Sequence, residues 1–176
     1  MRFSMAAVLA GLASTALLAG GGAGGKAEVK GPHICCAQCV RVVNAILKDV
    51  PGVSDVTPDS KTKSVTFKAG DAKAAQAGVK ALVDGGFFGS ATLDGKEIQV
   101  DVPAPRRGEK SATVTVKDVH VCCGSCQKAI NALFKDAKVT YEGKGPQRTV
   151  RIAGTDLDAG EVLTNLRKAG FNGTPE

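Results

Sequence analysis

The chain repeats itself, and this repetition limits its fold more than any other feature. The segment His33-Ile34-Cys35-Cys36-Ala37-Gln38-Cys39 returns as His120-Val121-Cys122-Cys123-Gly124-Ser125-Cys126, eighty-seven residues later. At the same offset, Asn44 to Asp49 matches Asn131 to Asp136. Each copy covers about 60 to 65 residues, a size at which a single domain folds with little stability to spare. The sequence therefore predicts two copies of one small domain.

Both copies show the same succession of strand and helix patterns. Pro51-Gly52 ends the first helix, and Pro58-Asp59-Ser60 marks a hairpin turn. The expected elements are 27–34, 39–50, 53–57, 63–68, 72–84 and a short strand after Phe87, and in the second copy 113–121, a helix from Cys126, 138–142, 148–152, 158–169 and a short strand after Phe171. This order predicts an α+β protein of two ferredoxin-like βαββαβ domains, each an antiparallel four-stranded sheet with two helices on one face.

The expected domain boundaries follow from these elements. The first domain is predicted at 26–102 and the second at 111–176, with a Pro- and Arg-containing linker at 103–110. Asp94-Gly95 is a strong two-residue hairpin signal and predicts an extra edge strand at the end of the first domain. Because proline keeps the linker partly extended, the two domains need not pack tightly against each other.

Residues 1–23 have the pattern of a secretory signal peptide. Arg2 precedes an apolar run from Met5 to Leu18, and small residues follow, with cleavage expected after Ala19 or Ala23. The alternative is a retained membrane anchor, but the run is shorter than the roughly 20 residues that span a bilayer. We therefore expect an exported protein, periplasmic or extracellular, with no stable membrane span after cleavage.

Composition argues against two other classes of protein. The formal net charge is +6, but the basic residues are dispersed, and with one Tyr and no Trp the chain lacks stacking platforms for nucleic acid. No Ser-His-Asp set, phosphate-binding loop or paired-carboxylate motif occurs in a supporting context. We expect neither nucleic-acid binding, nor catalytic residues, nor an organic cofactor, and the chain is predicted not to be an enzyme.

All six cysteines and both histidines lie in the two repeated segments. Thiolates and imidazoles are ligands for soft or borderline ions such as Cu(I) and Zn(II). The pairs Cys36/Cys39 and Cys123/Cys126 have the spacing that lets two thiolates at the start of a helix face one ion, and the helix N-terminus stabilises their charge. Further candidate ligands are Cys35, Cys122, His33 and His120, which raise the possible set to three sulfurs and one nitrogen per domain. The spacing alone does not choose between Cu(I) and Zn(II), nor decide whether the two sites share an ion.

Each copy resembles the heavy-metal-associated domain of copper chaperones, copper-transporting ATPases and mercury-binding periplasmic proteins. The resemblance lies in the strand and helix order, the CxxC at the first helix and the Gly-Phe before the last strand. It implies Cu(I) binding by the two CxxC pairs and transfer to a donor or acceptor protein by ligand exchange. This chain has Ile34 and Val121 where the family usually has Met, and Cys35 and Cys122 are additional. Extra ligands should slow release and favour storage, sequestration or sensing.

Two other roles remain open for the cysteines. In an exported protein they could form structural disulfides, although adjacent cysteines bridge each other only with strain. A CxxC at a helix start is also the geometry of thiol-disulfide exchange proteins. The remaining repeated residues have structural interpretations: Gly86 and Gly170 are expected to end helices in a left-handed conformation, and Phe87 and Phe171 are expected in the core.

Overall fold

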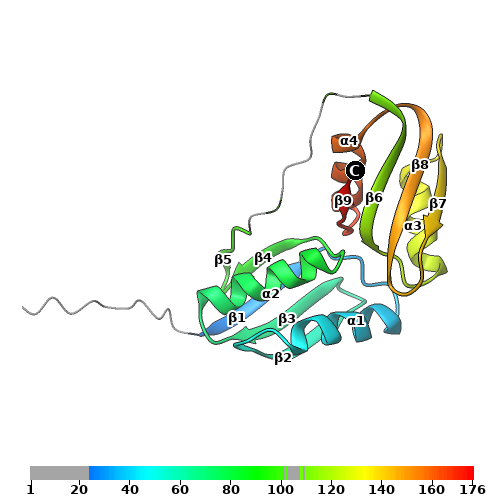
Figure 1. The fold of residues 1–176 in the computed structure, drawn as a ribbon. Coiled ribbons are helices and arrows are strands. Elements are labelled where there is room, and N and C mark those ends of the chain that lie inside the picture. The colour runs from blue at the N-terminus through cyan, green and yellow to red at the C-terminus, as the bar shows by residue number, and fades with distance from the viewer. Residues whose placement is uncertain (1–23, 101, 103–107, 109) are drawn as a thin grey trace, which may run out of the picture.

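The computed structural model describes residues 24–100, 102, 108 and 110–176. The predicted signal peptide (1–23) and most of the predicted linker (103–110) lie outside the described residues. Within the described part, the chain is a mixed α+β protein with two antiparallel sheets and four helices (Figure 1). We refer to residues 24–100 as the N-terminal half and to residues 110–176 as the C-terminal half. No helix in these two halves is long and apolar enough to cross a bilayer.

The N-terminal half builds a five-stranded sheet in the order β2-β3-β1-β4-β5. Its elements are β1 (Gly25–Lys30), α1 (Ala37–Lys48), β2 (Val53–Asp59), β3 (Ser64–Ala69), α2 (Ala72–Asp84), β4 (Ser90–Leu93) and β5 (Lys96–Glu97). The predicted edge strand is present as β5, which is two residues long. Asp94 and Gly95 both have positive φ (48° and 79°), as a two-residue hairpin turn requires.

The C-terminal half builds a four-stranded sheet in the order β7-β8-β6-β9, which corresponds strand for strand to β2-β3-β1-β4. Its elements are β6 (Lys110–His120), α3 (Gly124–Leu133), β7 (Lys138–Glu142), β8 (Gln147–Asp158), α4 (Ala159–Lys168) and β9 (Thr174–Pro175). The last strand is only two residues long. The element order of the first half therefore recurs in the second, apart from β5.

The first strand ends earlier than the sequence pattern predicts. It was expected to reach Ile34, but β1 stops at Lys30 because Gly31 takes a left-handed φ of 97° and Pro32 has no N–H to donate to a neighbouring strand. In the C-terminal half, β6 contains a register shift between Val116 and Val119, with Asp118 at φ 58°. Such a bulge redirects the following side chains. Because β1 ends at Lys30, the loop that follows it places His33 and Cys35, and the alternation of side chains along a strand does not.

Each helix buries the apolar face that its periodicity predicts. In α1 the buried residues are Cys39, Val43 and Leu47, and in α3 they are Cys126 and Ile130. The carboxylate of Asp71 caps the N-terminus of α2 by accepting a hydrogen bond from the Ala74 amide at 2.7 Å. The first turns of α1 and α3 have no such side-chain cap, because cysteines stand at their N-cap positions.

The two halves pack against each other, a contact that the linker composition neither required nor excluded. Phe87 and Phe171 form an antiparallel bridge, and one connected cluster of buried apolar residues runs through both halves. The carbonyl oxygen of Gly170 accepts hydrogen bonds from the amides of His33 and Phe88, both at 3.0 Å. In the symmetric position, the carbonyl of Gly86 accepts from the Asn172 amide at 2.9 Å. The linker composition did not reveal this, because the contacts come from the Gly-Phe turns.

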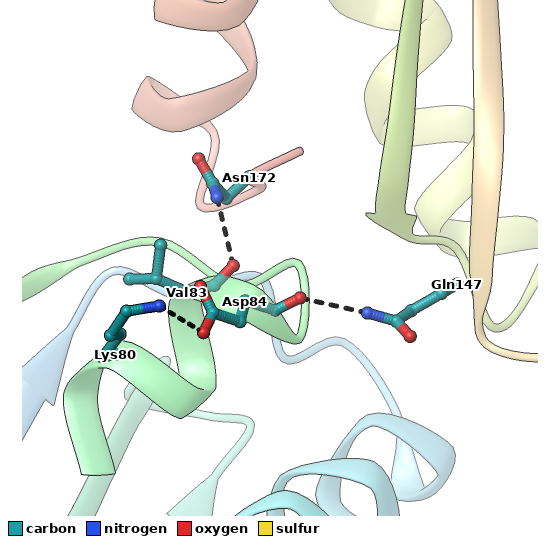
Figure 2. Close-up of polar contacts among 5 residues, drawn as sticks. All are labelled: Lys80, Val83, Asp84, Gln147 and Asn172. Atoms are coloured by element: carbon teal, nitrogen blue, oxygen red, sulfur yellow. Dashed lines mark hydrogen bonds and ion pairs between the residues drawn. The ribbon is translucent and has the colours of Figure 1, made fainter. Parts of the chain in front are cut away.

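Side chains extend the contact at the end of α2. Figure 2 shows the Asn172 side chain donating to the carbonyl of Val83 at 3.0 Å, and Gln147 donating to the carbonyl of Asp84 at 3.1 Å. Lys80 pairs with the Asp84 carboxylate at 2.6 Å on the exposed side of the same helix. The C-terminal carbonyls of α2, which lack partners within their own helix, thus receive donors from the other half.

Candidate metal centre

The packing of the two halves brings all six cysteine thiols into one cluster. The cluster lies where the N-termini of α1 and α3 meet, and nine Sγ···Sγ contacts of 3.4 to 3.9 Å connect its members. Five of these contacts join one half to the other. All six residues are free thiols. The sequence left open whether the two motifs meet, and the structure brings them together.

The helix starts place equivalent cysteines in equivalent positions. Cys36 and Cys123 are the N-cap residues of α1 and α3, with extended backbone conformations and partly exposed side chains. Cys39 and Cys126 follow in the first turn and are fully buried. The N-terminal end of each helix carries a partial positive charge, which favours anionic groups bound near it.

The residues between the histidines and the cysteines anchor the two loops. Ile34 is 1% exposed and Val121 is fully buried, so both pin their loops to the core as their apolar character predicts. The Val121 amide donates to the carbonyl of Pro146 at 2.7 Å. The loops are therefore anchored in the core, while their own thiols, those of Cys35, Cys36, Cys122 and Cys123, remain partly exposed.

Both histidines border the thiol cluster. Nitrogen and sulfur atoms of His120, Cys39, Cys122 and Cys126 lie within 4.8 Å of one another, as do those of His33, Cys35 and Cys126. A third group of this kind is formed by three thiols, those of Cys35, Cys36 and Cys123. His120 is fully buried, and neither of its ring nitrogens has a hydrogen-bond partner; Nε2 of His33 is also buried without one. A buried polar atom without a partner costs about 1–3 kcal/mol, which a ligand at the nitrogen would offset.

Aromatic contacts across the interface orient the two imidazoles. The His33 ring stacks on Phe171 with centroids 4.2 Å apart, and the His120 ring stacks on Phe87 at 4.3 Å. Each histidine is thus held by the Phe of the opposite half. Both phenylalanines are buried, as predicted, and the structure adds a positioning role that the sequence did not indicate.

The glycines before these phenylalanines make the contact possible. Gly86 and Gly170 have φ of 88° and 85° just after the ends of α2 and α4, which confirms the predicted left-handed helix ends. A Cβ on Gly86 would overlap the backbone nitrogen of His120, and one on Gly170 would overlap the carbonyl oxygen of Gly31. Only glycine therefore allows the two backbones to approach at these points. The sequence repeats both a Gly-Phe motif and a Cys-His motif, and this repetition was the available signal. Nothing in the sequence showed that the Gly-Phe motif of one half contacts the Cys-His loop of the other.

The cluster perturbs the acidity of its thiols. The neighbouring thiol of Cys126 lowers the pKa of Cys39, while Cys39 in turn raises the pKa of Cys126. Burial raises the pKa of Cys35 and of Cys122. For Cys123, burial acts in the same direction but is outweighed by the amides of Cys126 and Ser125 and by the Cys35 thiol, and the pKa falls to about 6. The thiols of the cluster thus differ in acidity, with lowered pKa at Cys39 and Cys123 and raised pKa at Cys35, Cys122 and Cys126.

Comparison with known proteins adds little to this geometry. No protein-family model and no curated protein matches the chain. Among solved structures, the chain is similar to the solution structure of the N-terminal soluble domains of CopA from Bacillus subtilis, with 13% identity over 88% of this chain and 95% of that one and a TM-score of 0.29. A likeness at this level does not identify a shared ligand, so the function is inferred from the thiol cluster itself.

Proposed function

We propose that the chain is an exported binding protein for soft metal ions, that Cu(I) is its principal cargo, and that it is not an enzyme. In this proposal each half is a ferredoxin-like βαββαβ domain of the heavy-metal-associated type, and residues 1–23 direct export to the periplasm or the outside of the cell. Zn(II) is the alternative ion.

One observation carries the proposal: the only cysteines and histidines of the chain converge on a single cluster. Six thiols within contact distance supply the soft ligands that Cu(I) prefers. Two histidines complete the donor set, with three buried nitrogens between them that have no hydrogen-bond partner. Packing alone does not account for eight metal-ligand side chains at one interface.

The sulfur spacing bears on the coordination number. With a metal–sulfur bond of about 2.3 Å, two thiolates on opposite sides of an ion lie about 4.6 Å apart, three around an ion about 4.0 Å, and two in a tetrahedral set about 3.8 Å. The contacts of 3.4 to 3.9 Å lie nearer the last two values. This favours three or four ligands per ion over the linear two-coordinate site of a simple CxxC pair. More ligands slow release, so sequestration or storage is favoured over rapid delivery.

An anaerobic titration of the reduced protein with Cu(I) against a chromogenic competitor tests the proposal. A parallel titration with Zn(II) shows which ion is preferred. We expect tight Cu(I) uptake that is lost when Cys36, Cys39, Cys123 and Cys126 are replaced by serine. If neither ion is bound tightly, the metal-binding proposal is wrong.

A thiol-disulfide exchange function is the second candidate, and the acidity of Cys123 favours it. A pKa of about 6 leaves this thiol mostly ionised at neutral pH, as a nucleophile in disulfide exchange must be. Turnover of a disulfide substrate by the metal-free protein, lost in Cys123→Ser, would support this function. Tight Cu(I) uptake without such turnover would exclude it.

A further inference from the structure

The nine thiol contacts contain two closed triangles. In one, Cys35 lies 3.6 Å from both Cys123 and Cys126, and these two lie 3.8 Å apart. In the other, Cys122 lies 3.9 Å from Cys36 and 3.4 Å from Cys39, and these two lie 3.7 Å apart. Among the six cysteines, all of which the structure describes, no other set of three is connected by contacts on every side, and the two triangles share no sulfur.

Each triangle combines residues from both halves. The CxxC pair of one half is completed by the extra cysteine of the other half, so the additional Cys35 faces Cys123 and Cys126, and the additional Cys122 faces Cys36 and Cys39. The two triangles are equivalent by the sequence repeat. This arrangement gives the extra cysteines a role that their own CxxC pairs do not require.

The backbone explains why a cysteine does not complete the triangle of its own half. Cys36 and Cys123 have extended conformations, with φ/ψ of −158°/170° and −154°/171°. Successive side chains on an extended backbone point to opposite sides. Cys35 and Cys36 therefore leave opposite sides of the backbone, as do Cys122 and Cys123, and neither adjacent pair is among the thiol contacts, although the sulfurs of Cys35 and Cys36 lie within 4.8 Å of each other. Each loop sends one sulfur to one triangle and the next sulfur to the other.

The histidines follow the same division. His33 lies with Cys35 and Cys126, two members of the first triangle, and His120 lies with Cys39 and Cys122, two members of the second, with Cys126 also near. His33 and His120 each precede the extra cysteine of the same loop by two residues. The His-x-Cys segment of one half thus reaches the Cys-x-x-Cys segment of the other.

We infer that the protein holds its ions in two composite sites, each built from the His-x-Cys of one half and the Cys-x-x-Cys of the other. One site consists of His33, Cys35, Cys123 and Cys126, and the other of His120, Cys122, Cys36 and Cys39. This replaces the expectation of one self-contained site per repeat and rests on the proposed soft-metal function. Its consequence is that ion binding joins the two halves, because neither half alone supplies a complete set of ligands.

Two double variants with the same number of lost thiols distinguish composite from self-contained sites. Cys35→Ser with Cys123→Ser removes two ligands from one composite site and leaves the other complete. Cys35→Ser with Cys36→Ser removes one ligand from each composite site. If each half held its own site, these results would be reversed, since the second variant would damage only the N-terminal half.

The measurement is the number of Cu(I) ions that each full-length, reduced variant holds at wild-type affinity in anaerobic competition with a chromogenic chelator. We expect about two ions for the wild type, about one for Cys35→Ser/Cys123→Ser and none for Cys35→Ser/Cys36→Ser. Circular dichroism and an unfolding curve of each metal-free variant verify that it is folded. The matched pair Cys122→Ser/Cys36→Ser and Cys122→Ser/Cys123→Ser repeats the test on the other site, with one ion expected for the first and none for the second.

Each other outcome contradicts the inference in a different way. One ion in Cys35→Ser/Cys36→Ser and none in Cys35→Ser/Cys123→Ser shows self-contained sites. Equal loss of all ions in both variants shows a single indivisible cluster. Absence of tight uptake by the wild type refutes the proposed soft-metal function itself and is thereby distinguished from a failure of the composite arrangement.

Discussion

Replacement of Gly170 by alanine should separate the two halves of the molecule. Gly170 has φ 85°, a conformation that costs an alanine about 1–2 kcal/mol. Its Cβ would also overlap backbone atoms of the loop between β1 and α1, among them the carbonyl oxygen of Gly31 and, at 2.8 Å, the carbonyl carbon of Pro32. Backbone cannot rotate away as a side chain can, and forced overpacking costs about 1–3 kcal/mol. The two effects sum to about 2–5 kcal/mol lost from the free energy of unfolding.

Gly143→Ala is the matched control for this substitution. Gly143 lies in the same half and has φ 95°, but a Cβ there would have no atom within 4 Å. It should therefore lose only the conformational part, about 1–2 kcal/mol. The difference between the two variants isolates the steric effect of the interface.

Urea unfolding of the metal-free, reduced proteins followed by circular dichroism measures both effects. The wild type should unfold in one transition, because its buried cluster runs through both halves. Gly170→Ala should unfold at lower urea and in two resolved steps, and should bind fewer Cu(I) ions at wild-type affinity because the composite sites need docked halves. If Gly170→Ala is no more destabilising than Gly143→Ala, the reasoning about backbone contact at Gly170 is refuted.

Three further predictions concern single features. Burial raises the pKa of Tyr141 from 10.0 to about 12, so the ultraviolet absorbance of this sole tyrosine should titrate near 12. Because the folded-state pKa is the higher one, the stability contributed by the neutral phenol is complete below pH 10 and is lost as the pH rises through 12. A titration midpoint at 10 would contradict this. Asp71→Ala should cost about 0.5–2 kcal/mol of unfolding free energy by removing the cap of α2, whereas Asp71→Asn should keep most of it; equal losses in urea unfolding would disprove the capping role. Free Cu(I) at 100 times its dissociation constant should add about 2.7 kcal/mol to the unfolding free energy per site, reversed by a chelator; an unchanged urea midpoint would show that the folded state holds no ion.

Much of the local structure follows from short-range patterns in the chain. Val43 and Leu47 repeat at helical spacing and are buried on α1, and Asp94-Gly95 makes the expected hairpin between β4 and β5. Such features depend on a few neighbouring residues, so one sequence is enough to read them. The end of the first strand was misjudged because the apolar Ile34 suggested a continuation that Gly31 and Pro32 prevent.

The candidate ligands were equally accessible to sequence reasoning, but their grouping was not. Cys35 and Cys36 are neighbours in the chain, and proximity in sequence suggested that both serve the same ion. In the structure they belong to different triangles: Cys35 contacts Cys123 and Cys126 of the other half, whereas Cys36 contacts Cys39 of its own half and Cys122 of the other. Neither the buried state of His120 nor its stacking on Phe87 is encoded in the motif around it.

The sequence by itself determined that its cysteines and histidines lie in two matching segments, and which elements follow each segment. These properties come from repetition, periodicity and turn chemistry, all of which act over short stretches of chain. Only the tertiary structure decided that the halves dock through Gly86-Phe87 and Gly170-Phe171 and thereby exchange partners between their thiol loops. Docking depends on the fit of two surfaces far apart in the chain, and that fit exists only after each half has folded.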